Sequence, residues 1–328
     1  MSVSLPVAVD AMGGDKAPAE IVAGAVRAAA ELGVPVVLVG QPEVLADLDT
    51  GGLEVIPASE VIGMHDDPGQ GVRRKKDSSL VRAAEAVRDG TACAMVSAGN
   101  TGATMASALL RMGRISGVQR PAIATPIPVP GTTPTILLDA GANAECQAAW
   151  LVQFAQMGSV FATERYGISA PRVGLLSIGE EDTKGTPLVK ETHALLKDTP
   201  GLRFIGNVEG RDILTDEVDV VVTDGFTGNV ALKTLEGGIK FIVNKVLEAM
   251  MSSDEAKDAA KVLLPALGPL ADELEPDNTG GAMLLGVDGV CIISHGSSSA
   301  TAVVNAVRVA RDMVDAGLVD HLRSAIKA

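Results

Sequence analysis

Six short turns rich in glycine and polar residues recur along the chain, most of them directly after an apolar run that predicts a strand. They read AMGGDKAP (11–18), SAGNTGA (97–103), DAGAN (139–143), IGEEDTKGTP (178–187), TDGFTGNV (223–230) and SHGSSSA (294–300). Strand, turn and helix in repeated succession predict βαβ units and a mostly parallel sheet. Because ligands bind at the carboxyl ends of such strands, we expect one large ligand-facing edge. Free N–H groups and helix N-termini there favour anions, phosphate above all.

Hydrophobic periodicity places the elements around these turns. Strands are expected at about 5–9, 35–39, 53–57, 93–97, 121–128, 134–138, 172–177, 202–206, 218–222 and 290–293. Helices are expected at about 18–32, 78–89, 101–112, 146–163, 187–197, 229–251, 255–270 and 298–315. The segment PAIATPIPVPGTTPTILLDA predicts an antiparallel pair joined by a Pro/Gly turn. We expect one domain over residues 1–328, with a helical protrusion at 240–276.

The second helix of the protrusion carries an apolar stripe at helical spacing. Its members are Ala256, Ala259, Ala260, Leu263, Leu267 and Leu270. Pro265 is expected to kink this helix. Two interpretations stay open: the stripe packs within the protein or against a second copy, or it makes a shallow membrane contact. Lys257 and Lys261 alone could attract anionic lipid, so a membrane contact is expected to be weak.

Composition narrows the range of partners. A net charge of −14 and an aromatic content of 2% argue against nucleic acid, which demands a basic surface and rings for stacking. One basic run stands out, Arg73-Arg74-Lys75-Lys76, directly before a helix capped by 77–79. Such runs are usually solvated surface. Cations before a helix N-terminus oppose its dipole, however, and that local cost favours a binding role.

The chain also carries signs of its compartment. It has no basic segment followed by an apolar one at its N-terminus, so no signal peptide is expected. No apolar run reaches about 18 residues, so no membrane span is expected. Three cysteines without CxxC spacing predict reduced, cytosolic thiols.

Two turns offer small and amide residues for ligand binding. In SAGNTGA, Gly99 and Gly102 allow close backbone approach, and Asn100 and Thr101 add hydrogen bonds. In TDGFTGNV, Gly225 and Gly228 shape the turn and Asn229 begins the long helix. Neither turn is a Walker loop or a GxGxxG fingerprint, so no nucleotide is implied.

Two further turns carry side chains suited to catalysis. Lys184 lies in IGEEDTKGTP beside three acidic residues, where it would serve as a surface ion pair or hold an anion or a developing oxyanion. His295 ends a buried strand before a serine-rich helix start, where it would be a structural hydrogen-bonding residue or an acid–base group. Cys146 would need a base to act as a nucleophile, and a small residue at a helix start is the favoured interpretation. The four scattered histidines form no metal set, and no cofactor is expected.

Taken together, the ordered motifs resemble those of the PlsX phosphate acyltransferases of bacterial phospholipid synthesis. They run from VAVDAMGGD (7–15) to HGSSSATAVVNAV (295–307) and include RRKKDSSL, LLDAGAN, GNVEGRDI (206–213), DVVVTDGFTGNVALKTLEGG (219–238) and GGAMLLGV (280–287), besides SAGNTGA and IGEEDTKGT. One departure is GANAEC where GANVDC is expected, which leaves Asn143 in place. The resemblance implies a three-layer α/β/α Rossmann-like sandwich related to the isocitrate dehydrogenase and phosphotransacetylase group, with a protruding helical hairpin.

The resemblance also implies an activity and partners. The implied reaction moves a fatty acyl group from acyl carrier protein to inorganic phosphate, giving an acyl phosphate that a glycerol 3-phosphate acyltransferase uses. The family forms homodimers and associates peripherally with membrane, which implies a cytoplasmic protein at the inner face of the membrane. The run Arg73, Arg74, Lys75 and Lys76 then has an acidic partner in the carrier protein. Leu263 and Leu267 become the expected membrane contacts.

On this basis we assign expected roles to individual residues. Phosphate would be bound by Gly99, Asn100, Thr101 and Gly102 with help from Gly228 and Asn229. Lys184 would stabilise the phosphate or the oxyanion, His295 would protonate the leaving thiolate, and Asn100 would complete the catalytic set.

Three rival functions stay open. A short-chain phosphotransacetylase that uses coenzyme A shares the fold and the reaction type. A dehydrogenase of the related decarboxylating group lacks support, because the chain shows no dinucleotide fingerprint or acidic metal cluster. A non-catalytic scaffold for membrane enzymes would not need so many polar glycine turns.

Overall fold

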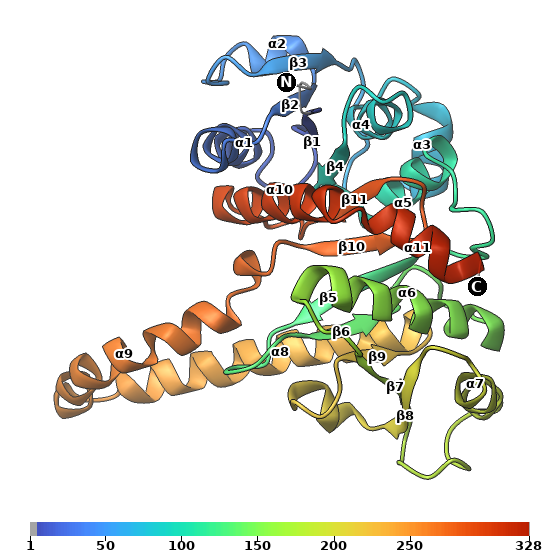
Figure 1. Cartoon of the computed structure of the whole chain (residues 1–328). Coiled ribbons are helices and arrows are strands. Elements are labelled where there is room, and N and C mark those ends of the chain that lie inside the picture. The colour runs from blue at the N-terminus through green and yellow to red at the C-terminus, as the bar shows by residue number, and fades with distance from the viewer. Residues whose placement is uncertain (1–4, 328) are drawn as a thin grey trace.

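An eleven-stranded sheet runs through the molecule, and helices cover both of its faces (Figure 1). The computed structural model describes residues 5–327. The strand order is β3-β2-β1-β4-β11-β10-β5-β6-β9-β7-β8. The strands are β1 (Val7–Asp10), β2 (Val36–Gly40), β3 (Glu54–Pro57), β4 (Ala94–Ser97), β5 (Ala122–Ile127), β6 (Thr135–Leu138), β7 (Arg172–Leu176), β8 (Arg203–Val208), β9 (Val220–Val222), β10 (Ala282–Leu285) and β11 (Val290–Ile293). The expected three-layer α/β/α architecture is confirmed.

The helices divide between the two faces because strand residues alternate. Val7 and Val9 of β1 enter one buried cluster and Ala8 enters the other. Helices α1 (Ala19–Leu32), α6 (Ala148–Tyr166), α7 (Pro187–Lys197), α10 (Ala300–Asp315) and α11 (Leu318–Lys327) cover the first face. Helices α3 (Pro68–Arg74), α4 (Ser79–Arg88), α5 (Thr101–Arg111) and the start of α8 (Gly225–Met250) cover the second. The short helix α2 (Pro42–Leu45) follows β2.

Two parallel blocks of strands meet through antiparallel pairs at the centre of the sheet. Strands β3, β2, β1, β4 and β11 are parallel, and so are β6, β9, β7 and β8. Strand β10 is antiparallel to both β11 and β5, and β5 is antiparallel to β6. The predicted β5–β6 hairpin is therefore confirmed. The reversal also divides the six glycine turns between two blocks of strands, rather than placing them on one continuous edge.

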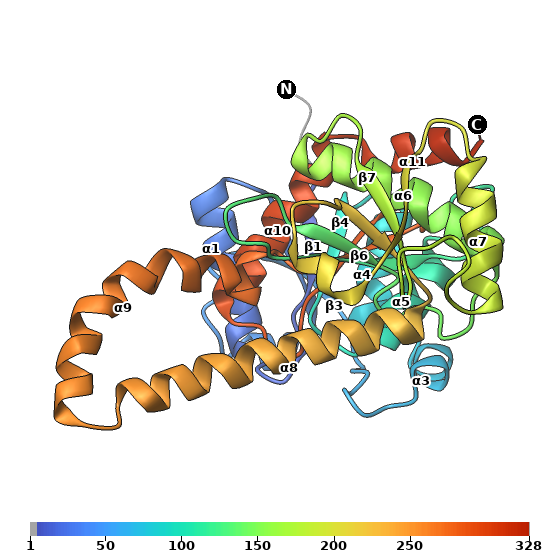
Figure 2. The same cartoon turned by 90° about the horizontal axis from the view of Figure 1, so that it is seen from below.

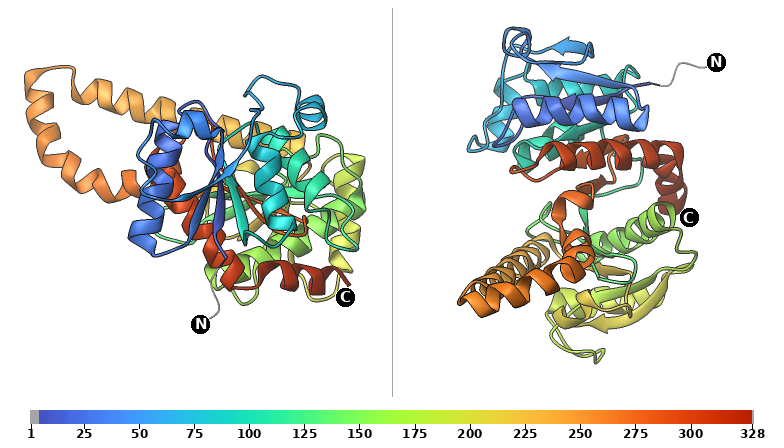
Figure 3. Two further views of the ribbon diagram at one scale, coloured as in Figure 1. Left: turned by 90° about the horizontal axis from the view of Figure 1, so that it is seen from above. Right: turned by 90° about the vertical axis from the view of Figure 1, so that its left-hand side faces the viewer.

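Helices α8 and α9 (Asp254–Leu274) form a hairpin that protrudes from the body (Figures 1 and 3). Ser253 caps α9, with its Oγ accepting a hydrogen bond from the Ala256 N–H at 3.1 Å. Pro265, expected to kink this helix, lies inside α9 together with Pro269, and Figure 2 shows α9 curving back toward the body. Ala260 is buried, but Val262 and Leu263 remain 77% and 54% exposed. The protruding helical hairpin is confirmed, and most of its apolar stripe is uncovered within this chain.

Candidate active site

The turns after β1, β4 and β11 pack backbone to backbone and form a first cluster. A Cβ on Gly13 would lie 2.9 Å from the Gly99 nitrogen, and one on Gly14 would lie 3.2 Å from the Gly296 carbonyl oxygen. The Asp15 N–H donates to the same Gly296 oxygen at 2.7 Å. Side chains other than hydrogen would force these turns apart, so the glycines are needed for the close approach.

A buried carboxyl lies beneath this first cluster. The Ser97 hydroxyl donates to Asp10 Oδ2 at 2.7 Å and accepts from the Gly99 N–H at 3.0 Å. Burial raises the pKa of Asp10, and hydrogen bonds from Ser79 and Ser97 oppose that shift. Asp10 therefore holds the SAGNTGA turn from below.

The predicted residues of the first cluster differ in how free their side chains are. Asn100 caps α5 by accepting from the Ala103 N–H at 3.0 Å, and its amide donates to the carbonyl oxygens of Met64 and Asp66. Thr101 is exposed. A Cβ on Gly102 would lie 2.7 Å from Pro68 Cγ, so this glycine lets α3 approach α5. Both amide hydrogens of Asn100 thus hold the loop before α3.

His295 lies exposed at the rim of the same cluster. Its Nδ1 is 2.8 Å from Ser297 Oγ and accepts from the Ser297 N–H at 3.2 Å. Because Nδ1 accepts this N–H, the ring's proton is placed on Nε2. No hydrogen bond joins Nε2 to another residue of the described chain. The ring can therefore offer Nε2–H to a ligand.

A second cluster forms where DAGAN meets the start of α8. A Cβ on Gly228 would lie 1.9 Å from the Asp139 carbonyl oxygen, and the Gly225 N–H donates to the Asn143 carbonyl at 2.8 Å. Asn229 lies next to Gly141, whose Cβ would be 3.5 Å from Asn229 Cβ. Gly228 and Asn229 are thus brought against DAGAN.

Asp139 organises this second cluster from a buried position. Its carboxylate accepts from the backbone N–H groups of Ile123, Gly141, Ala142 and Asn143 and from the Asn143 side-chain amide. Burial raises the pKa of Asp139, and the hydrogen bonds from Ala142 and Asn143 lower it in part. The sequence analysis gives Asp139 no role of its own. Its position directly after an apolar strand is the pattern that could have identified it.

Lys184 lies in the turn after β7, which neighbours β9 in the same block. Its side chain is exposed, and no carboxylate of residues 5–327 lies within ion-pair distance of its ammonium group. Surface salt bridging to its three acidic neighbours, one of the two interpretations of this lysine, is therefore not found. An unpaired lysine on an ordered turn suits an anionic ligand.

The Lys184 turn is anchored from below by two buried side chains that sequence reasoning missed. His193 Nδ1 lies 3.0 Å from Asn207 Oδ1, and His193 Nε2 lies 3.4 Å from Asp182 Oδ1. The Asn207 amide donates to the Glu181 carbonyl at 2.9 Å. The turn is thereby fixed to α7 and β8. The two residues lie in separate predicted elements, so no local pattern linked them.

The structure does not bring all the predicted site residues together. Gly99–Gly102 and His295 belong to the first cluster, and Lys184, Gly228 and Asn229 belong to the second block of strands. The turns that follow β4 and β9 are five strand positions apart in the sheet order and belong to different parallel blocks. The residues expected to bind phosphate thus lie on turns of two different blocks of strands.

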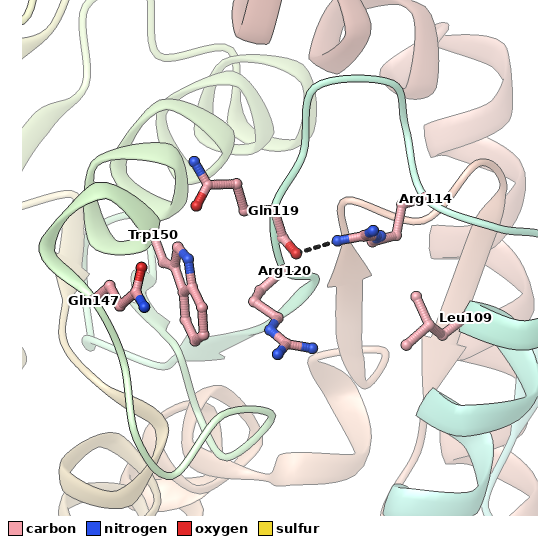
Figure 4. Close-up of a pocket in the computed structure, with 6 residues that line it drawn as sticks. All are labelled: Leu109, Arg114, Gln119, Arg120, Gln147 and Trp150. Atoms are coloured by element: carbon pink, nitrogen blue, oxygen red, sulfur yellow. Dashed lines mark hydrogen bonds between the residues drawn. The ribbon is translucent and has the colours of Figure 1, made fainter.

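A pocket of about 600 Å³ lies beside the second cluster (Figure 4). Its lining residues are Leu109, Arg114, Gln119, Arg120, Gln147 and Trp150. The guanidinium carbon of Arg120 lies 4.8 Å from the centre of the Trp150 ring. Sequence reasoning missed this pocket, although RISGVQR, with two arginines and no acid, was an available signal in so acidic a chain.

Cys146 lies next to this pocket and is half-buried. Burial raises the pKa of its thiol to about 11. The thiol is therefore protonated at neutral pH, which supports the interpretation of Cys146 as a small residue at a helix start rather than a nucleophile.

The basic run at 73–76 lies on the surface. It was expected only to precede a helix, but its first two residues end another helix, α3. Arg73 and Arg74 form the last turn of α3, where the negative end of the helix dipole favours cations. The cost expected from their place before α4 is therefore offset. Lys75 Nζ donates to Asp66 and to the Val61 carbonyl, both at 2.7 Å. Arg73, Arg74 and Lys76 are exposed and without an ion pair to any described residue.

Residues 5–327 contain neither a metal-binding cluster nor a membrane-spanning helix. No group of three or more histidine, cysteine or acidic side chains there is placed to hold a metal ion. Every helix in this range is too short or too polar to cross a membrane.

Comparison with known proteins gives consistent results along the whole chain. The profile of a family described as "Fatty acid synthesis protein" matches residues 5–321. A phosphate acyltransferase of Nostoc sp. is 46% identical, over 98% of this chain and 96% of that protein. A phosphate acyltransferase of Elusimicrobium minutum is 50% identical, over 98% of this chain and 95% of that protein.

Solved structures show the same fold at low sequence identity. The EutD phosphotransacetylase from Staphylococcus aureus superposes with a TM-score of 0.58 and 16% identity, covering 94% of each chain. A branched-chain phosphotransacylase from Enterococcus faecalis V583 superposes with a TM-score of 0.61 and 15% identity, covering 94% of this chain and 99% of that one. The expected relation to the phosphotransacetylase fold is confirmed.

Proposed function

The chain belongs to the fatty acid synthesis protein family that includes the phosphate acyltransferases, and on that premise we propose that it transfers a fatty acyl group from acyl carrier protein to inorganic phosphate. The observation that carries this proposal is 46–50% sequence identity to phosphate acyltransferases over 98% of the chain. The two ordered, glycine-lined clusters support it, because both offer backbone and side-chain groups to an anion.

The chemistry needs no enzyme-bound acyl intermediate. A phosphate oxygen attacks the thioester carbonyl carbon, the C–S bond breaks, and an acyl phosphate and a thiolate result. The proton lost by hydrogen phosphate balances the one that the thiolate gains. The protein must hold phosphate against the carbonyl and stabilise the tetrahedral oxyanion. The high thiol pKa of Cys146 agrees with direct attack by phosphate.

Because the expected residues lie in two clusters, there are two candidate positions for the phosphate site. In one, Gly99, Asn100, Thr101 and Gly102 hold phosphate, Asn100 completes the catalytic set, and His295 protonates the thiolate. In the other, Gly228 and Asn229 hold phosphate and Lys184 stabilises it or the oxyanion. We favour the second, because the Lys184 ammonium is unpaired within the described chain whereas the Asn100 amide already holds the loop before α3.

Acyl phosphate formation from palmitoyl-acyl carrier protein and phosphate tests the proposal. Wild-type protein should turn over, and a folded Lys184→Ala variant should lose at least about a hundredfold in kcat/KM if the lysine stabilises developing charge. Lys190→Ala, which removes an exposed lysine from nearby α7, is the matched control and should retain activity.

The other outcomes separate the alternatives. Turnover with acetyl-coenzyme A but not with the carrier protein would assign a phosphotransacetylase. Equal loss in Lys184→Ala and Lys190→Ala would remove the specific role of Lys184. A large rise in KM for phosphate in Thr101→Ala, without an effect of Lys184→Ala, would favour the first cluster.

The same proposal places the protein in the cell. The acyl phosphate would pass to a glycerol 3-phosphate acyltransferase, a membrane enzyme in this scheme. We infer a cytoplasmic homodimer weakly and peripherally attached to the inner face of the membrane through the α8–α9 hairpin. The exposed Leu263 and Leu267 support this placement.

A further inference from the structure

The pocket beside DAGAN has an unusual charge for this protein. The chain has 41 acidic and 27 basic residues, yet the six residues that line the pocket include two arginines and no carboxylate. Neither Arg114 nor Arg120 has a carboxylate within ion-pair distance among residues 5–327. The pocket therefore concentrates positive charge in an acidic molecule.

The N-terminus of α6 adds to this charge. Gln147, at the N-cap, and Trp150, in the first turn, both line the pocket. No side chain caps this nineteen-residue helix, and its first turn has no acidic residue. Free N–H groups and the positive end of the helix dipole thus lie beside the two guanidinium groups.

The arginines are held in place by their surroundings. The guanidinium carbon of Arg120 lies 4.8 Å from the centre of the Trp150 ring, and this cation–π contact holds the group beside the ring. Arg114 donates to the Gln119 carbonyl, as Figure 4 shows. Gln153 holds the same loop by accepting from the Gln119 N–H at 2.8 Å and donating to the Gly117 carbonyl at 2.9 Å. Hydrogen bonds from side chains of the same chain thus hold the loop.

The pocket also has an apolar side and room for more than a bare ion. Leu109 and the Trp150 ring contribute apolar surface, and about 600 Å³ exceeds what a phosphate ion needs. Paired guanidinium groups match the tetrahedral oxyanion of phosphate through forked hydrogen bonds.

We propose that this pocket binds a phosphate group of the substrates, with Arg120 and Arg114 as its ligands. The identity of the ligand rests on the proposed function, which supplies two sources: the inorganic phosphate acceptor, and the phosphate at the base of the pantetheine arm that carries the acyl group on the donor. The anion site itself rests on the geometry of the pocket.

Equilibrium binding, measured by calorimetry without turnover, tests the site. The probes are inorganic phosphate, 4′-phosphopantetheine and pantetheine, which lacks the phosphate. Wild-type protein should bind at least one phosphate-bearing probe, and Arg120→Gln should weaken that binding at least about tenfold. Arg120→Lys should restore it only in part, because the forked geometry is lost. Arg27→Gln, on α1, is the control and should bind as wild type does.

Each result has one meaning. Weaker binding of 4′-phosphopantetheine alone supports the donor arm as the source, and weaker binding of inorganic phosphate alone supports the acceptor. Arg114→Gln should act in the same direction as Arg120→Gln. Unchanged binding of both probes in Arg120→Gln, or no binding to wild type, would overturn the site. Arginine-dependent binding in a protein that forms no acyl phosphate would retain the site and refute the proposed function.

Discussion

At Gly228, the absence of a side chain decides where α8 can begin. A Cβ there would lie 1.9 Å from the Asp139 carbonyl oxygen, a backbone atom that cannot rotate away. We expect Gly228→Ala to lower the free energy of unfolding by about 3 kcal/mol, as overpacking against rigid structure does. Urea unfolding followed by circular dichroism would measure the change.

A second glycine of the same helix provides the control. No atom lies within 4 Å of a Cβ placed on Gly237. Gly237→Ala should therefore raise stability by up to about 1 kcal/mol through helix propensity. Equal effects of the two substitutions would show that the contact with Asp139 does not constrain α8.

Single residues also show how far sequence reasoning reaches into the site. The glycine turns could be found because glycine is needed where backbones touch, as at Gly13 and Gly99. The supports beneath them could not, because His193 and Asn207 meet only through tertiary packing. Arg120 was missed for the same reason: its partner Trp150 lies in another element. The assigned roles of Lys184, His295 and Asn100 stay predictions.

Among the elements, the α8–α9 hairpin is the one with the least internal cover. Leu263, near the middle of α9, is 54% exposed. If it enters lipid, Leu263→Glu should weaken vesicle binding about tenfold to a hundredfold, the free energy of burying one leucine. Flotation with vesicles containing anionic lipid would measure this, with Leu263→Met as the apolar control.

The same variant separates the two interpretations of the stripe. A folded Leu263→Glu protein that floats like wild type would rule out lipid contact at this position. Dissociation into monomers, measured by light scattering, would assign the residue to packing between two copies. Leu267→Glu, on the next turn of the stripe, should give the same result as Leu263→Glu.

Elements with strong periodicity could be predicted from the sequence, and short ones could not. The α7 bounds, 187–197, and the antiparallel β5–β6 pair agree with expectation. Strand β10 was missed because its four apolar residues stand between glycines and resemble a loop. Helix α3 was missed because Gly69 and Gly71 weaken its pattern. That omission misplaced the basic run relative to the helix dipoles.

At the scale of the whole molecule, one part of the surface carries the charge opposite to the net charge of the protein. Arg73, Arg74 and Lys76 form an exposed cationic surface on a protein of net charge −14. If the acidic carrier protein docks there, Arg73→Glu with Lys76→Glu should raise KM for the acyl carrier about tenfold and leave kcat unchanged. Wild-type activity should also fall as salt rises, because exposed charge pairs are screened.

The control for carrier docking keeps the same change in net charge. Arg27→Glu with Lys190→Glu reverses two cations on α1 and α7, on other parts of the surface. Its KM for the carrier should remain close to that of wild type. A similar rise in both double variants would mean that overall charge, rather than the surface at 73–76, governs the encounter.

The place of β10 and β11 in the sheet has a consequence for synthesis on the ribosome. These strands, from residues 282–293, lie between β4 and β5, which are complete by residue 127. Until the last seventh of the chain emerges, β4 and β5 each expose an unpaired edge, and the two blocks of strands are joined only by the connecting chain. A hairpin made late in synthesis therefore closes the sheet. For nearly half of its elongation, from residue 127 to residue 282, the nascent protein exposes two unpaired strand edges that are prone to aggregation.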